Sequence, residues 1–266
     1  MKKKNLSAVF YALSFCALGF VLMSLSIGLL STRGDGFTAK KSVSAEPFAE
    51  ADSTATEESA LTAASPIILI DAGHGGEDGG ASSADGVTEK DLNLSLSRDI
   101  AHLCLIFGIP YEMTRDDDTL LYDRYGELES YEGRKKSLDL KNRLRMAEEL
   151  NTVLFLSIHM NKFPSASVKG FQVYYSNNSA DSRPLAESMQ GFVKSHVQPY
   201  NERLPKASDS SIYLLKNIQT TALLAECGFL SNAEEAASLN TPAYRVSLAA
   251  AIFVPAAEYY VRSIIK

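Results

Sequence analysis

Cysteine is scarce in this chain, with three residues among 266, so the sequence contains no framework of disulfide bridges. Cys104 falls within a helical pattern, and Cys227 follows a short apolar run. We expect both to be small, buried hydrophobic residues, although a disulfide between them is compatible with the sequence. Internal repeats are absent as well, which argues against a repeat architecture.

Positive charge is also in short supply. Lysine and arginine number 26 against 32 aspartates and glutamates, which gives a formal net charge of -6. An acidic balance argues against nucleic acid as the main partner. The length and a hydrophobic content of 45% are sufficient for one catalytic domain plus a tail.

The amino terminus differs in kind from the rest of the chain. Three lysines, at positions 2–4, precede an uncharged, apolar stretch at 6–30. A membrane span needs about 20 apolar residues, whereas the core of a cleaved signal has about 7 to 15, so we predict an uncleaved anchor. A cleaved signal is the alternative, although the nearest small-residue pattern, at 43–45, lies well beyond the apolar core. The lysines place the amino terminus in the cytoplasm and the remainder outside the membrane.

These features divide the chain into four segments. Residues 1–5 are a cytoplasmic stub and 6–30 a transmembrane signal-anchor. Residues 31–65, rich in Ser, Thr, Ala, Glu and Gly without apolar periodicity, form a flexible linker. Residues 66–266 form the catalytic domain.

Short apolar runs alternate with helical patterns throughout this domain. The predicted strands are 67–71, 111–114, 153–158, 171–175 and 222–225. Apolar residues recur at helical spacing between the first two, at Leu92, Leu96, Ile100, Leu103 and Phe107, and Gly108 closes that helix. The alternation predicts an α/β fold: a single three-layer domain with a mostly parallel or mixed sheet and helices on both faces.

Three further helices are expected. One contains Leu140, Leu144 and Ala147, with Ser137 as its cap. The next runs along Leu185, Met189, Phe192, Val193 and His196, with His196 on its inner face. The last begins at Thr241 and Pro242, and Pro255 is expected to kink it.

Chemically competent residues follow the predicted strands. Ile67 to Ile70 read as a buried strand that ends in a histidine among glycines, His74. His159 follows the strand at 153–158, Glu226 follows the strand at 222–225, and Glu89 lies at the start of the first long helix. Because ligands of open α/β sheets bind at the carboxyl ends of the strands, we expect these four side chains to converge.

Two neutral imidazoles and one carboxylate, with an open fourth position, are the usual ligands of a catalytic zinc ion. His74, Glu89 and His159 would be those ligands, and Glu226 the general base that passes a proton from water to the leaving amine. Each residue also has a structural alternative: Glu89 could stabilise a helix amino terminus, His159 could be a core histidine, and Glu226 could pair with an arginine. Asp71 could likewise cap a turn. Together, the four residues favour a zinc hydrolase of an amide or ester.

Five motifs carry a resemblance to a known family, and the resemblance extends over residues 67–260. They are Asp71-Ala-Gly-His-Gly-Gly-Glu-Asp-Gly-Gly-Ala81, Glu89-Lys-Asp-Leu-Asn-Leu94, Thr114-Arg115 before three aspartates, Ser157-Ile-His-Met-Asn161 and Glu226-Cys-Gly-Phe-Leu-Ser-Asn232. In combination they resemble the zinc-dependent N-acetylmuramoyl-L-alanine amidases of bacterial cell walls. The resemblance implies zinc bound by His74, Glu89 and His159, catalysis by Glu226, and cleavage of the amide between muramic acid and L-alanine in peptidoglycan.

The membrane anchor, the lack of wall-binding repeats and two further stretches resemble the sporulation- and germination-specific amidases in particular. These stretches are Gly133-Arg134-Lys135-Lys136 and Ile212-Tyr-Leu-Leu-Lys-Asn217. That likeness implies action on spore cortex in the forespore intermembrane space, with an accessory activator and a partner deacetylase that leads to muramic δ-lactam. Two other functions stay open: a zinc peptidase acting within the stem peptide, and a non-catalytic wall-binding module.

Overall fold

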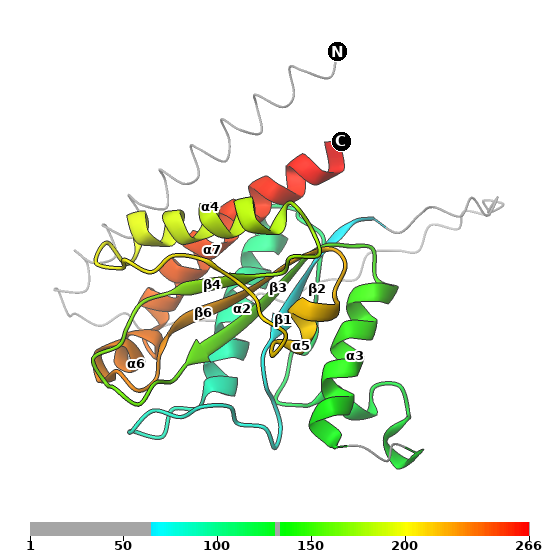
Figure 1. Cartoon of the computed structure of the whole chain (residues 1–266), viewed down its shortest axis with the longest axis horizontal. Coiled ribbons are helices and arrows are strands. Elements are labelled where there is room, and N and C mark those ends of the chain that lie inside the picture. Colours follow the sequence, from blue (N-terminus) through cyan, green and yellow to red (C-terminus); the bar gives the residue numbers. More distant parts are fainter. Residues whose placement is uncertain (1–64, 131–133, 266) are drawn as a thin grey trace, which may run out of the picture. The chain divides into compact units, whose positions relative to one another are not determined.

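The computed structural model describes residues 65–130 and 134–265 (Figure 1). The predicted cytoplasmic stub, the predicted transmembrane helix and all but the last residue of the predicted linker lie outside the described residues. The catalytic domain predicted at 66–266 is described except for residues 131–133 and 266.

A six-stranded mixed sheet forms the centre of this domain, in the order β2-β1-β3-β6-β4-β5. The strands are β1 (Ile67–Ala72), β2 (Tyr111–Met113), β3 (Thr152–Asn161), β4 (Gln172–Tyr175), β5 (Lys206–Ala207) and β6 (Thr221–Phe229). All neighbouring strands are parallel except β4 and β6, which are antiparallel. The central strands are apolar on both sides because helices cover both faces of the sheet.

Helices cover the two faces and give three layers (Figure 1). On one face lie α2 (Glu89–Ile106), α4 (Ser182–His196), α6 (Ala233–Leu239) and α7 (Pro242–Ile265), which pack on a core that includes Ile70 and Leu156. On the other lie α3 (Lys135–Glu149), α5 (Tyr213–Asn217) and the short 3₁₀ turn η1 (Leu121–Asp123), over a smaller core that includes Phe155. A second 3₁₀ turn, η2 (Leu128–Ser130), precedes α3. The predicted α/β architecture is confirmed.

Helix α7 is a core helix of this domain. By length and composition it is the one helix among the described residues that could cross a membrane. Half of its most apolar 18-residue segment is buried in the domain, and Leu248, Ile252 and Phe253 lie in the larger core. Pro255 lies within α7, which continues beyond it to Ile265. The predicted kink stays a prediction.

Several sequence-based boundaries were wrong. Strands β3 and β6 extend three and four residues past the apolar runs that predicted them, so His159 and Glu226 lie within strands rather than after them. Backbone pairing does not depend on side-chain polarity, so the ladder continues where the apolar pattern stops. Ser137 does not cap α3, because the helix begins at Lys135 and the Ser137 N–H donates to the Arg134 carbonyl.

The remaining predictions concern cysteines and histidines. Cys104 and Cys227 are both buried and free, as small hydrophobic residues. His102 is exposed, in keeping with its place off the apolar stripe. His196 was placed on an inner face, and this was wrong: it is exposed and stacks on Phe192, with ring centroids 4.0 Å apart.

Candidate metal centre

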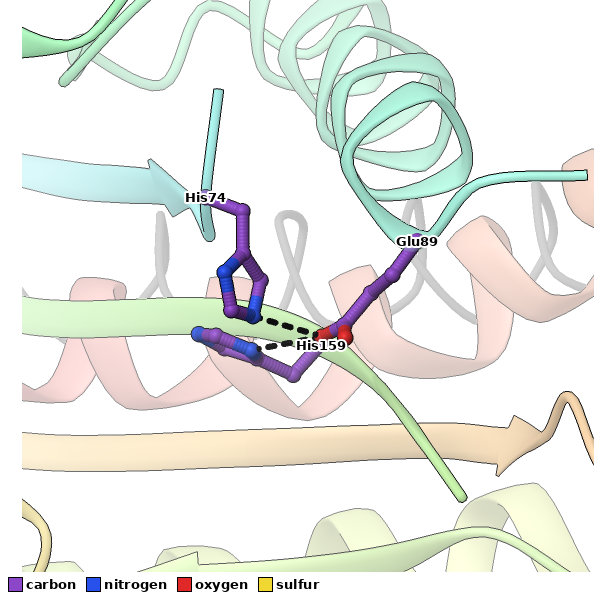
Figure 2. A group of neighbouring side chains, drawn as sticks. All are labelled: His74, Glu89 and His159. Carbon is purple, nitrogen blue, oxygen red and sulfur yellow. Dashed lines mark hydrogen bonds and ion pairs between the residues drawn. The ribbon is translucent and has the colours of Figure 1, made fainter. Parts of the chain in front are cut away.

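Three of the predicted site residues meet at the carboxyl edge of the sheet (Figure 2). His74 lies in the loop after β1, Glu89 is the first residue of α2, and His159 lies near the end of β3. One ligand atom from each lies within 4.8 Å of the others. Glu89 Oε1 is 2.9 Å from His159 Nδ1 and 3.2 Å from His74 Nε2. Residues far apart in the sequence therefore face a common point.

Two glycines permit this close approach. A Cβ atom at Gly73 would lie 2.2 Å from His159 Nε2, and one at Gly80 would lie 2.5 Å from Glu89 Oε2. Gly80 also has a φ of +65°, which other residues rarely adopt. With two imidazole nitrogens and a carboxylate oxygen converging, the donor set fits a zinc ion of the catalytic type.

Glu89 is buried and held in its ionised form. Its Oε2 accepts a hydrogen bond from the Ala81 N–H at 2.8 Å, and its Oε1 accepts one from the Met160 N–H at 3.2 Å. Burial raises the pKa of this carboxyl group, but hydrogen bonds and charge interactions with His159 and His74 outweigh burial and lower the pKa. An ionised carboxylate at this point is ready to bind a cation.

The orientation of His74 is set by a second carboxylate. Its Nδ1 lies 2.9 Å from Asp78 Oδ2, which in turn lies 2.9 Å from the Lys136 ammonium. Burial lowers the pKa of His74, but the carboxylates of Glu89 and Asp78 outweigh this and raise it. A neutral His74 that donates its Nδ1 proton to Asp78 would have Nε2 available to bind a metal ion. Metal-binding histidines are commonly oriented by a carboxylate in this way.

Buried arginines hold the loop that carries His74. Of the described residues other than glycine, His74 alone has a positive φ, +61°. Arg143, on α3, donates to the backbone carbonyl oxygens of Ala72 and His74, both at 2.9 Å. Arg115 donates to those of Ala72 and Gly73, at 2.9 and 3.0 Å. The loop conformation is thus fixed by groups from outside the loop.

Asp71 anchors Arg143. Its Oδ1 lies 2.5 Å from Arg143 Nη1, and its Oδ2 accepts from the Ser157 hydroxyl at 2.6 Å. Burial raises the pKa of Asp71, but Arg143 and Ser157 outweigh burial and keep the pKa below its usual value. Asp139 holds the other side of the guanidinium, 2.8 Å from Arg143 Nε. The alternative that Asp71 merely caps a turn is replaced by a buried ion pair beneath the site.

Glu226 lies beside His159 on the neighbouring strand, because the two residues pair in the β3–β6 register. Its Oε2 is buried and has no hydrogen-bond partner among the described residues. Burial raises the pKa of Glu226 to about 7; His159 opposes this and the charge of Glu89 adds to it. A pKa near the working pH suits a group that must accept and then release a proton.

The sequence therefore identified the residues that meet, and missed those that orient them. Arg143, Asp139 and Asp78 were not singled out as site residues. Asp78 could have been found, because it follows His74 by four residues within the same glycine-rich loop. Arg143 had no local signal, since its partner Asp71 is 72 positions away.

Comparisons with known proteins agree on one family. Residues 68–255 match the family model described as N-acetylmuramoyl-L-alanine amidase. The germination-specific N-acetylmuramoyl-L-alanine amidase of Bacillus subtilis (strain 168) is 31% identical over 194 residues, which cover 73% of this chain and 79% of that relative.

Solved structures match as well. The CwlD amidase from Clostridioides difficile, in complex with the GerS lipoprotein, has a TM-score of 0.68 and 36% identity, over 74% of this chain and 98% of that chain. The catalytic domain of CwlV, an N-acetylmuramoyl-L-alanine amidase from Bacillus (Paenibacillus) polymyxa, has a TM-score of 0.60 and 27% identity, over 73% of this chain and 98% of that chain.

Proposed function

Because the chain belongs to the N-acetylmuramoyl-L-alanine amidase family, we propose that it cleaves the amide between muramic acid and L-alanine of peptidoglycan as a zinc hydrolase. The observation that carries this proposal is the cluster of His74, Glu89 and His159 beside the unpartnered Glu226. These four side chains supply three ligand atoms and one proton acceptor at one edge of the sheet.

His74, Glu89 and His159 would hold the metal. When bound, a zinc ion polarises the scissile carbonyl and lowers the pKa of water. Asp78 keeps His74 in the tautomer that leaves Nε2 free, and Arg143 keeps the loop of His74 in its unusual backbone conformation.

Glu226 carries the proton in this proposal. Its carboxylate takes a proton from the attacking water, whose oxygen forms the new bond to the lactyl carbonyl carbon. The same proton then passes to the amide nitrogen of L-alanine as the carbon–nitrogen bond breaks. The products are a stem peptide with a free amino terminus and a muramic acid carboxyl group, which ionises by losing the second proton of the water. Glu226 is again ionised once its proton has passed to the nitrogen.

The cellular setting is proposed from the relatives and the sequence. We place residues 66–266 outside the membrane, tethered by 31–65 to an anchor at 6–30, with 1–5 in the cytoplasm. A relative named germination-specific supports a role in spore cortex, where peptide removal would prepare muramic acid for a deacetylase and δ-lactam formation. The C. difficile amidase was solved with a lipoprotein, and we propose an accessory protein here too.

Mass spectrometry of peptidoglycan digested by the full chain, with and without added zinc, tests the activity. We expect zinc-dependent release of stem peptides that begin with L-alanine. Peptides clipped while still attached to the sugar would instead identify a zinc peptidase. Binding to peptidoglycan without any cleavage, in the presence of zinc, would identify a non-catalytic module.

Three variants test the assigned roles. Glu226→Ala should retain zinc and lose hydrolysis, because it removes the base and none of the ligands. His74→Ala should lose both zinc and hydrolysis. His102→Ala, which removes an exposed histidine, is the matched control and should lose neither. Normal turnover in Glu226→Ala would contradict the assignment of the base.

A further inference from the structure

A pocket of about 390 Å³ lies next to Glu226, on the side away from the His74–Glu89–His159 cluster. Its wall includes Tyr174 on β4, Lys206 on β5, and Asp209 and Ser211 in the segment between β5 and α5. None of these residues takes part in the proposed hydrolysis. The pocket therefore extends the site toward the β5 edge of the sheet.

The sheet order places the relevant residues on four consecutive strands. Strands β3, β6, β4 and β5 are consecutive neighbours, and they carry His159, Glu226, Tyr174 and Lys206 respectively. Tyr174 pairs with Leu224 on β6 and with Lys206 on β5. Since residues two apart on a strand share a face, Glu226, Tyr174 and Lys206 lie on the same side of the sheet.

Lys206 is the cation of this pocket that is free to bind a ligand. It is exposed, and among the described residues no hydrogen bond or ion pair occupies its ammonium group. The nearby Arg203 is engaged, since it donates to the Gln172 side chain at 2.8 Å and to the Lys169 carbonyl at 3.1 Å.

The acidic groups of the pocket do not neutralise Lys206 by direct contact. Asp209 accepts hydrogen bonds from both the backbone N–H and the hydroxyl of Ser211, and these lower its pKa. Glu226 is the other carboxyl group of the wall, and it lies two strands away from Lys206. An anionic group entering at the β5 end would therefore meet Lys206 first.

We propose that Lys206 binds a carboxylate of the stem peptide, so that this enzyme selects acidic stem peptides. The proposal rests on the proposed amidase function and adds a substrate preference to it. In the bound substrate, the scissile amide would lie at Glu226. The peptide would extend from there across β6 and β4 toward β5, with its carboxylate at the Lys206 ammonium.

The spacing of the strands indicates which residue of the stem peptide supplies the carboxylate that Lys206 binds. Two interstrand steps and an offset of two residues along the strands separate Glu226 from Lys206, which together amount to about 12 Å. An extended peptide advances about 3.3 to 3.6 Å per residue. Because the four-carbon stem of lysine covers part of this distance, the carboxylate belongs to the second or third residue of the stem peptide.

Paired synthetic substrates test the proposal with the full, zinc-loaded chain. They are N-acetylmuramoyl-L-alanyl tripeptides that differ only in a free carboxylate or a carboxamide on the second, or on the third, residue. For wild type we expect one of the two carboxylate substrates to have a KM about fivefold below that of its amide, with equal kcat. Fivefold corresponds to about 1 kcal/mol, the upper range for a solvent-accessible ion pair.

Variants of Lys206 test whether this residue causes the preference. Lys206→Met should raise the KM of the preferred carboxylate substrate about fivefold and leave the KM of the amide unchanged, whereas Lys206→Arg should keep the preference. The control Lys194→Met removes a lysine that pairs with Glu202 on the surface, and it should keep the preference as well.

Equal KM values for carboxylate and amide in wild type, or a preference that survives in Lys206→Met, would overturn the carboxylate site while leaving the amidase function intact. If wild type releases no peptide from any substrate, the proposed function itself fails, and this inference fails with it.

Discussion

Replacing Arg143 by methionine tests how the loop of His74 is held. The Arg143 side chain is almost completely buried and forms ion pairs with Asp71 and Asp139, at 2.5 and 2.8 Å. It also donates to the backbone carbonyl oxygens of Ala72 and His74. Methionine keeps an unbranched apolar stem and removes all of these interactions at once.

The expected loss of folding stability is large because the buried Asp71 carboxylate is left without its partner. Breaking a buried ion pair by removal of one member costs about 3–5 kcal/mol. For a domain of this size each 1 kcal/mol shifts Tm by about 2–4 °C, so Arg143→Met should lower Tm by about 6–20 °C. The control Arg145→Met removes half-exposed pairs with Glu127 and Glu149, and it should lower Tm much less, because solvent screens exposed ion pairs.

The pH dependence of this loss follows from Asp71. In wild type the pKa of Asp71 lies below its unfolded value, so the pair contributes fully above about pH 4 and its contribution is lost as pH falls through the folded pKa. The difference in Tm between wild type and Arg143→Met, measured by calorimetry, should therefore shrink between pH 7 and pH 3. Adding Asp71→Asn to Arg143→Met should recover part of the loss. Equal, small effects of Arg143→Met and Arg145→Met would refute this role of Arg143.

Three further changes probe the site. Asp78→Asn should weaken zinc binding about 10- to 100-fold in chelator competition, because the carboxylate that orients His74 is replaced by an amide; unchanged affinity would contradict this role. Gly73→Ala should also weaken zinc binding, since its Cβ would overlap the β3 histidine, whereas Gly79→Ala, whose Cβ meets nothing within 4 Å, should not; similar affinities for the two would show that crowding at Gly73 is unimportant. Without metal, Glu226→Gln should match wild type in Tm near pH 4 and exceed it at pH 8, because a folded pKa of about 7 makes ionisation of Glu226 destabilising as pH rises above its unfolded value; a pH-independent difference would contradict the raised pKa.

The residues that meet at the sheet edge were predictable because their signals are local. A histidine among glycines after an apolar run marks a turn at the end of a strand, and Glu89 marks a helix start three residues before the first apolar position of its stripe, Leu92. The general rule that binding groups gather at the carboxyl ends of strands then brings distant residues to one edge. This rule holds whichever strands are neighbours, so the sheet order was not needed to predict the cluster.

The supporting contacts could not be predicted, because they depend on the sheet order and on packing between layers. Arg143 lies on a helix that was recognised, but nothing in its sequence neighbourhood indicates that it reaches Asp71 on β1. The path from Glu226 to Lys206 requires β4 and β5 to follow β6 at the edge, and the two-residue β5 has no apolar pattern. The predicted ends of β3 and β6 were wrong for a related reason, since their hydrogen-bond ladders extend past the apolar residues.

Anomalous scattering at the zinc absorption edge, from crystals of the zinc-loaded protein, tests the proposed metal centre most directly. We expect one strong peak bounded by His74, Glu89 and His159, with Glu226 nearby but not bound to the ion. A peak at any other group of side chains, or Glu226 bound to the ion in place of one of these three, would contradict the proposed centre.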